Sequence, residues 1–170
     1  MNQQMIKSII AEAPSLLTIL WRSGKQTRVD ISEYINSTGY EKLKDAIFFA
    51  SAVVEEWGHG VEWADGEIGI DADSLYRLGK EQAGFAFPVT EFNEWMERNE
   101  LSLSAAAHAL GITRRTVVYY HGGHKPIPIY IKLACLGWDT LLSTSGMSMF
   151  RPDSMCQNAT EDTIKDLVAY

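Results

Sequence analysis

The spacing of apolar residues changes between residues 79 and 88, and this change constrains the fold more than any other feature of the sequence. Before it, apolar residues stand in short runs or alternate with polar ones, as in strands with one buried face. After it, they recur three and four residues apart, as along amphipathic helices. The sequence therefore predicts an α+β protein, in which a small N-terminal antiparallel sheet with short helices precedes an all-helical part.

The first half of the chain contains strand-length apolar segments separated by turn residues. Strands are expected over residues 5–10, 16–21, 27–32 and 48–57, and short helices over 41–47 and 71–79. Gly24 marks a hairpin turn, and Gly79 is expected to end the second helix. The large aromatic side chains of this half are expected in its core rather than in a ligand cage; they are Trp21, Trp57, Trp63 and Tyr76.

The second half contains helical segments with recognisable caps. Thr90, Ser102 and Thr113 are expected to begin helices, and Gly111 and Gly122 to end the second and third of them. A fourth helix is expected over residues 129–137, ended by Gly137, with Asp139 capping one more short turn. A polar tail with a possible helix at 160–170 follows. The expected domains are residues 1–84, 85–145 and 146–170.

Three residues near the middle of the second half have the spacing of two helices that cross at a tight turn. Such a pair needs a small residue on the first helix, a residue that tolerates positive φ in the turn and an apolar anchor on the second helix. Ala107, Gly111 and Val117 occupy these three positions. Ile112 and Tyr120 are expected to add apolar contacts to the same packing.

Residues 101–128, "LSLSAAAHALGITRRTVVYYHGGHKPIP", resemble the helix-turn-helix of phage-repressor-like (xenobiotic-response-element-type) regulators. The resemblance extends over about residues 92–138, but Tyr120 stands where a Trp is usual and His124 lengthens the Gly-Lys step. It implies a lambda-repressor-like domain whose second helix enters the major groove of duplex DNA. The residues that it places at DNA are Thr113, Arg114, Arg115, Val118 and Tyr119, with His124 and Lys125 at the phosphate backbone.

The charge of the chain bears on this interpretation in two ways. The formal net charge of −7 argues against a nucleic-acid binder, which usually carries a basic surface. However, residues 101–138 contain four Lys and Arg residues and neither Asp nor Glu. Two hypotheses therefore stay open for the helical domain: it contacts DNA, or it contacts another protein and its arginines are only solvated.

The N-terminal half resembles a family of short bacterial proteins of unknown function. The matching residues are Gly24, Val29, Asp30, Ile31, Leu43, Asp45, Phe48, Trp63, Asp73, Leu75 and Tyr76. Relatives are often encoded beside a second small protein, in an arrangement typical of toxin–antitoxin pairs. The resemblance implies a partner-binding or dimerising domain, and a homodimer is expected because dimers of helix-turn-helix domains contact two half-sites.

Catalysis, metal binding and a cofactor are not expected. The candidates are Asp30, Glu55, Glu56, His59 and Asp65. The segment "EEWGHG" can place Glu56 near His59, but none of the five belongs to a nucleophile, acid–base or metal-ligand pattern. Cys135 and Cys156 lack ligand spacing, and Cys135 is expected to be a buried thiol. No apolar run has the length of a membrane span, so a cytoplasmic protein is expected. The favoured function is a DNA-binding transcriptional regulator; the alternative is a non-catalytic protein-interaction adaptor or an antitoxin-like partner of a small toxin.

Overall fold

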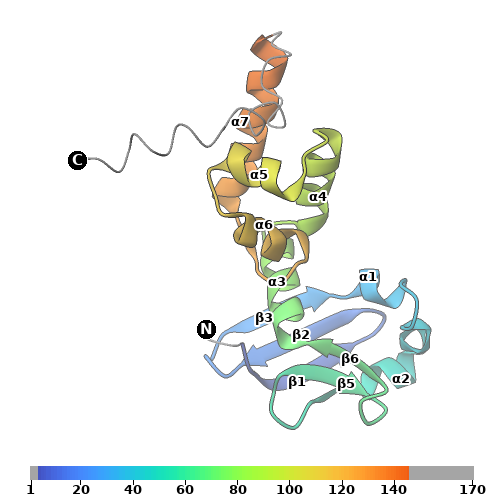
Figure 1. The fold of residues 1–170 in the computed structure, drawn as a ribbon. Coiled ribbons are helices and arrows are strands. Elements are labelled where there is room, and N and C mark those ends of the chain that lie inside the picture. The colour runs from blue at the N-terminus through green and yellow to red at the C-terminus, as the bar shows by residue number, and fades with distance from the viewer. Residues whose placement is uncertain (1–3, 146–170) are drawn as a thin grey trace. The chain divides into compact units, whose positions relative to one another are not determined.

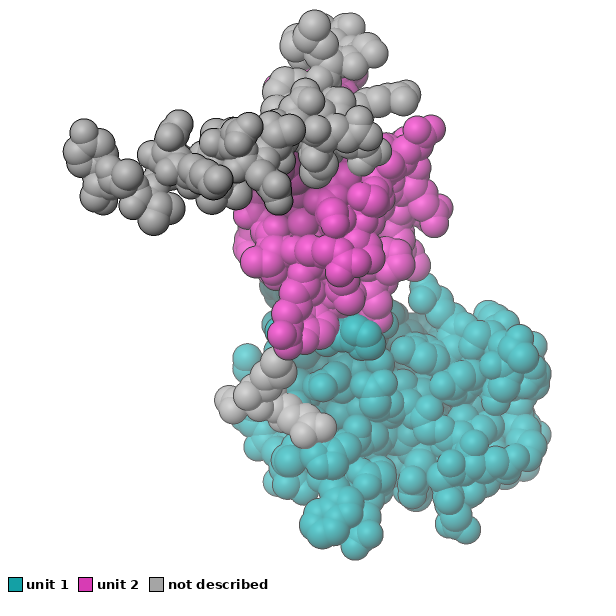
Figure 2. All heavy atoms as spheres, in the orientation of Figure 1, with its two compact units in different colours: residues 1–88, 123–127 teal, residues 89–122, 128–170 magenta. Residues whose placement is uncertain are grey.

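The computed structural model describes residues 4–145, and these form two compact units (Figures 1 and 2). The first unit comprises residues 4–88 and 123–127, and the second comprises 89–122 and 128–145. The first contains antiparallel sheets with short helices, and the second contains helices, which confirms the predicted α+β class. The predicted terminal helix at 160–170 and Cys156 lie outside the described residues.

The first unit contains two three-stranded antiparallel sheets, with strand orders β1-β2-β3 and β4-β5-β6. Its strands are β1 (Ile6–Glu12), β2 (Leu16–Trp21), β3 (Gln26–Asp30), β4 (Val53–Val54), β5 (Gly60–Trp63), β6 (Ile68–Asp71) and β7 (Ala86–Phe87). Its helices are α1 (Ser32–Ile35), a 3₁₀ helix (Glu41–Lys44), α2 (Ala46–Ala50) and α3 (Ala72–Gln82). A small third sheet pairs β7 with β8 (Ile127–Pro128).

Alternation along the strands builds the core of the first unit. In β2, Leu17, Ile19 and Trp21 are buried, and Val29 of β3 lies opposite Leu17 on the same face of the sheet. Residues of β5, β6 and α3 complete this single apolar cluster. The Trp21 indole N–H donates to the Thr27 hydroxyl at 3.0 Å, which satisfies a polar group that would be costly to bury alone.

The predicted strand at 48–57 is wrong, because this segment contains α2 and only the two-residue strand β4. The Asp45 carboxylate accepts the Phe48 N–H at 2.8 Å and caps α2. Within this helix Phe49 is fully buried, whereas Ile47 is 85% exposed. Residues two positions apart lie on the same face of a strand, so the opposite burial of Ile47 and Phe49 fits a helix and not a strand. Trp57 was expected in the core, yet it is 63% exposed.

Gly79 does not end α3, which continues to Gln82. The glycine is needed for packing instead. A Cβ atom at this position would lie 2.6 Å from the Thr27 Cγ2 atom and 3.2 Å from the Val29 Cγ2 atom. The absence of a side chain lets α3 lie directly on β3.

The second unit consists of α4 (Val89–Arg98), α5 (Leu103–Leu110), α6 (Arg114–His121) and α7 (Ile129–Ser145). Two of the predicted caps are confirmed: Ser102 accepts the Ala105 N–H and Thr113 accepts the Thr116 N–H, both at 3.2 Å. Thr90 is not a cap, because α4 begins at Val89. Gly137 does not end a helix, and Asp139 lies inside α7 rather than at a cap.

Among the described residues, no helix has both the length and the apolar character required to cross a membrane.

A Gly79→Ala substitution should lower the free energy of unfolding by about 1–2 kcal/mol, because the added methyl group overpacks the contact between α3 and β3. Thr27 cannot turn aside without breaking its hydrogen bond to Trp21. Urea denaturation followed by circular dichroism measures the change. Gly137→Ala is the matched control in a helix: no atom lies within 4 Å of its added Cβ, and stability should rise by up to about 1 kcal/mol. An unchanged or higher stability of Gly79→Ala would contradict this packing.

Candidate nucleic-acid interface

The helices α5 and α6 are joined by a tight turn over residues 111–113. Gly111 has a φ of 65°, a left-handed conformation that a glycine adopts without strain. The Ile112 N–H donates to the Ala107 carbonyl at 3.0 Å and completes the end of α5. Ala105, Ala106 and Ala107 are all buried, so α6 approaches α5 over a surface without large side chains.

One side of α6 anchors it to the second unit. Val117 is fully buried, and the ring of Tyr120 meets the Phe92 ring edge to face, with 6.2 Å between ring centroids. Burial raises the pKa of the Tyr120 hydroxyl above its usual range. From α4, the Asn93 side-chain amide donates to the His121 carbonyl at 3.2 Å, close to the C-terminal end of α6.

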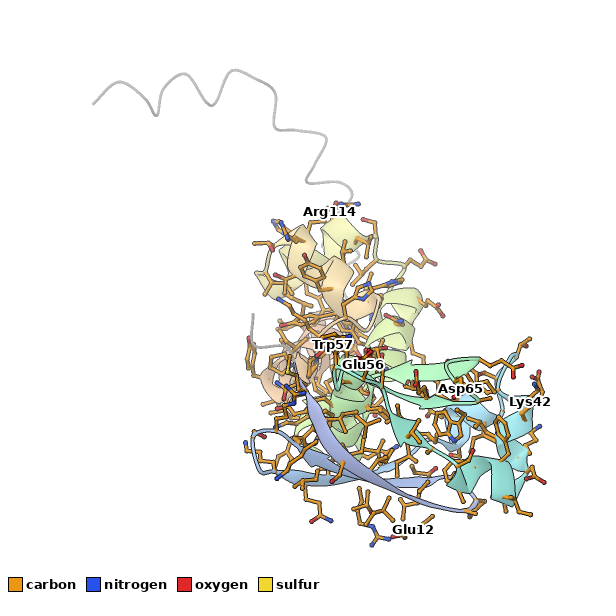
Figure 3. The ribbon with its side chains drawn as sticks, turned by 90° about the horizontal axis from the view of Figure 1, so that it is seen from below. Glu12, Lys42, Glu56, Trp57, Asp65 and Arg114 are labelled. Atoms are coloured by element: carbon orange, nitrogen blue, oxygen red, sulfur yellow. The ribbon has the colours of Figure 1, made fainter. Side chains whose placement is uncertain are left out.

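The other side of α6 carries the predicted DNA-binding residues. Arg114 and Arg115 are exposed, and Val118 is 36% exposed. Arg114 lies at the outside of the helical unit, where it is labelled in Figure 3. Among residues 4–145, no carboxylate lies within ion-pair distance of either arginine. Both positive charges are therefore directed at solvent without an internal counter-ion.

Arg115 and Tyr119 form one unit on this surface. The Arg115 guanidinium donates to the Tyr119 hydroxyl through Nε at 3.1 Å and through Nη2 at 2.8 Å. The guanidinium carbon also lies 5.4 Å from the centroid of the Tyr119 ring. These contacts restrict the rotamers of a long side chain, so Arg115 is more ordered than a solvated arginine.

Thr113 is already used by the fold. Its hydroxyl caps α6 and lies 2.8 Å from the Thr116 hydroxyl. The N-terminus of α6 carries no acidic residue in its first turn, and helix N-termini attract anions. His124 and Lys125, by contrast, belong to the 123–127 segment of the first unit, where both are exposed.

Sequence reasoning missed the residue that ties α7 to α4. The Asp139 carboxylate accepts three hydrogen bonds from side chains of α4 and the residue after it. The donors are the Trp95 indole N–H at 3.2 Å, the Arg98 guanidinium at 2.7 Å and the Asn99 side-chain amide at 2.9 Å. Its signal in the sequence is a lone acidic residue within the apolar segment 129–145. A buried indole N–H and a carboxylate that accepts three donors make this a structural connection.

Cys135, on the same helix, is buried as predicted. Burial raises the pKa of its thiol to about 12, so the thiol stays protonated at neutral pH.

Elsewhere, the acidic catalytic candidates Glu55 and Glu56 serve the backbone or face solvent, whereas the His59 Nδ1 atom is buried with no hydrogen-bond partner among the described residues. The Glu55 carboxylate accepts the His59 backbone N–H at 3.0 Å and so closes the turn before β5. Glu56 and Trp57 are exposed at this turn, where Figure 3 labels them. Within the described part of the chain, no three His, Cys, Asp or Glu side chains are grouped so that they could hold a metal ion.

Comparison with known proteins relates the chain to a family and to a solved structure. Residues 6–81 match the model of a family described as "Protein of unknown function (DUF2442)". The chain is also similar to a protein of known crystal structure from Nitrosomonas europaea that is named a "Putative DNA Binding Protein". The two are 40% identical with a TM-score of 0.53, and the match covers 82% of this chain and 90% of the other. No curated protein matches the chain.

An Asp139→Ala substitution should lower the free energy of unfolding by roughly 1–3 kcal/mol, because the Trp95 indole N–H loses its acceptor inside the unit. Glu91→Ala is the control. It removes the exposed Lys132–Glu91 ion pair between the same two helices and should cost at most about 1 kcal/mol. Urea denaturation followed by tryptophan fluorescence compares them. Equal effects of the two substitutions would show that the Asp139 network does not stabilise the unit.

Proposed function

We propose that this chain, which belongs to the same protein family as the Nitrosomonas europaea protein, binds duplex DNA through α5 and α6 acting as a helix-turn-helix. The observation that carries the proposal is the exposed side of α6, where Arg114 and Arg115 lie without an acidic partner among the described residues. The relative's name supports DNA as the partner.

In the proposed complex, the N-terminal half of α6 lies in the major groove. Arg115, ordered by Tyr119, is suited to a bidentate contact with the O6 and N7 acceptors of a guanine. Arg114 is suited to a phosphate or a second base, and Val118 to the methyl group of a thymine. Thr113 is suited to a phosphate contact together with the first N–H groups of α6.

His124 and Lys125 are proposed to contact the phosphate backbone beyond α6. The distribution of charge along the sequence supports DNA contact in this part of the chain. Residues 1–84 carry eight Lys and Arg residues against thirteen Asp and Glu residues. This excess of acidic residues repels DNA, whereas Arg114 and Arg115, in the acid-free segment 101–138, attract it.

We further propose that two copies associate through the exposed face of α7. This face carries large apolar side chains and no charged residue; its members are Ile129, Tyr130, Leu133, Leu136, Gly137, Thr140 and Leu141. The two charged residues of the helix, Lys132 and Asp139, bind α4 instead.

An identical uncharged face on a second copy meets this one without like-charge repulsion, although the whole chain is acidic. A dimer would present two copies of α6 to two half-sites of an operator. The protein would then be a cytoplasmic transcriptional regulator that acts by binding rather than by catalysis.

Replacing Arg114 and Arg115 together by Ala should weaken DNA binding at least tenfold and reduce its salt dependence. The slope of log affinity against log salt should become shallower by about 0.9 for each DNA phosphate that the arginines no longer neutralise. Fluorescence anisotropy with a pool of random duplexes, measured across salt concentrations, tests this. The matched control replaces two exposed lysines of the first unit, Lys7 and Lys44, by Ala. It should leave both the DNA affinity and its salt dependence unchanged. Failure of the wild type to bind duplexes at low salt would overturn the DNA proposal.

A Leu133→Glu substitution at the centre of the exposed face of α7 should convert dimers to monomers, because it would bury two carboxylates in an apolar interface. Light scattering coupled to size-exclusion chromatography at tens of micromolar protein measures the mass. Ile47→Glu, at an apolar residue that is 85% exposed in the first unit, is the control and should leave the dimer intact. A wild type that is monomeric at this concentration would contradict the proposed interface.

A further inference from the structure

A groove of about 460 Å³ runs along β3 in the first unit. One wall is the strand, and the other is the C-terminal half of α3 with the loop that follows it. Its lining combines aromatic and basic side chains with two small residues; they are Trp21, Tyr76 and Phe85, then Lys25, Arg28 and Lys80, then Gly79 and Ala83. Thr27 and Gln26 complete the lining.

The strand that forms this wall is an edge strand, because β3 pairs only with β2 in the order β1-β2-β3. Two hydrogen bonds at its ends show which backbone groups of β3 point toward β2. The Trp21 N–H donates to the Lys25 carbonyl at 2.8 Å, and the Ile31 N–H donates to the Ser15 carbonyl at 2.9 Å. These bonds place odd-numbered residues of β3 in hydrogen-bonded pairs with β2. The N–H and carbonyl groups of the even-numbered residues, Gln26, Arg28 and Asp30, therefore point outward.

A side-chain amide of the protein already binds one position of this strand edge. The Asp30 N–H donates to the Gln82 side-chain carbonyl at 2.9 Å, and the Gln82 side-chain amide donates to the Asp30 carbonyl at 2.7 Å. One side-chain amide thus makes both bonds that a residue of an added strand would make. Gln26 and Arg28 continue the same edge into the groove.

The basic side chains that line the groove determine the charge of the ligand that it can bind. Lys80 Nζ lies 5.5 Å from the ring centroids of both Tyr76 and Phe85. Arg28 has only an exposed ion pair with Glu12, at 3.3 Å. Among residues 4–145, neither Lys25 nor Lys80 has a carboxylate within ion-pair distance. Three cations therefore converge on one groove of a unit in which acidic residues otherwise predominate.

The geometry points to a peptide-binding site: an extended, acidic segment of a partner protein adds to the sheet as a strand beside β3. Its backbone bonds the outward groups of Gln26 and Arg28, as in other cases in which a peptide extends an exposed sheet edge. Every second side chain points into the groove, where Tyr76 and Phe85 receive an apolar group. Carboxylates of the peptide meet Lys25, Arg28 and Lys80. Phe85, which is 72% exposed, becomes covered on binding.

The site goes beyond the proposed DNA binding, because every residue that lines it belongs to the first unit. The groove is also lined by Ala83, a small exposed residue just after the end of α3, which leaves that part of the wall without a large side chain.

The test uses the full chain and a fluorescein-labelled peptide, Glu-Val-Glu-Phe-Glu-Val-Glu, with both ends blocked. Fluorescence anisotropy should show saturable binding of this peptide and at least tenfold weaker binding of the version with Lys in place of Glu. Two further versions of the peptide carry N-methyl groups on alternate backbone amides. One version is methylated at the odd-numbered residues and the other at the even-numbered residues. Because an added strand bonds the sheet through only one set, one version should lose binding at least tenfold and the other should retain it.

Substitutions in the protein locate the site. Lys25→Glu together with Lys80→Glu should abolish peptide binding, whereas Lys7→Glu together with Lys44→Glu should retain it. Gln26→Pro removes one outward N–H from an edge strand without removing a bond to β2, and it should weaken binding at least tenfold. Circular dichroism confirms that each variant is folded.

Three results would overturn the proposal: no binding of the acidic peptide at 1 mM, equal binding of the Lys version, or equal binding of both N-methylated versions. Displacement of the peptide by duplex DNA, together with weaker DNA binding of the Lys25/Lys80 variant, would instead make the groove a phosphate-binding surface. None of the three overturning results involves DNA, Arg114 or Arg115, so failure here is distinguishable from failure of the proposed DNA binding.

Discussion

In both units, the indoles that are almost fully buried each have a hydrogen-bond acceptor. Trp21, Trp63 and Trp95 are almost fully buried, and an indole N–H without a partner in an apolar core is costly. Each acceptor lies on a different element from its donor: Thr27 of β3, the Phe49 carbonyl of α2 and Asp139 of α7. The three bonds thus also determine how these elements pack. The β2–β3 bond holds the Thr27 methyl group against Gly79, and the α4–α7 bond holds the helix whose outer face is apolar.

Features that depend on neighbouring residues were predictable from the sequence. Ser102 and Thr113 cap their helices because a hydroxyl reaches the N–H three residues later, and Gly111 ends α5 because it adopts a positive φ. The strand β2 was predicted with its observed bounds. Division of α6 into a buried and an exposed side also followed from helical spacing, with Val117 and Tyr120 inside.

Features that depend on distant residues were not predictable. Glycine usually ends a helix, but Gly79 is retained inside α3 because Thr27, far away in sequence, occupies the space of a side chain. Asp139 resembles a cap, yet α4 supplies three donors that hold it inside α7. The segment 48–57 is apolar enough for a strand, and only the cap at Asp45 and the burial of Phe49 without Ile47 distinguish the helix α2.

The two proposed binding surfaces differ in whether the sequence alone reveals their positive charge. Arg114 and Arg115 are adjacent in an acid-free segment, so a count along the chain detects them. Lys80 is far from Lys25 and Arg28 in the sequence, with many acidic residues between them, and it meets them because Gly79 lets α3 lie on β3. The summed charge of residues 1–84 is negative and conceals this group of cations. An acidic protein can therefore offer separate sites to phosphates and to carboxylates, provided that most cations of each group lack an internal acidic partner; in the groove, Arg28 alone of the three has one, an exposed pair with Glu12.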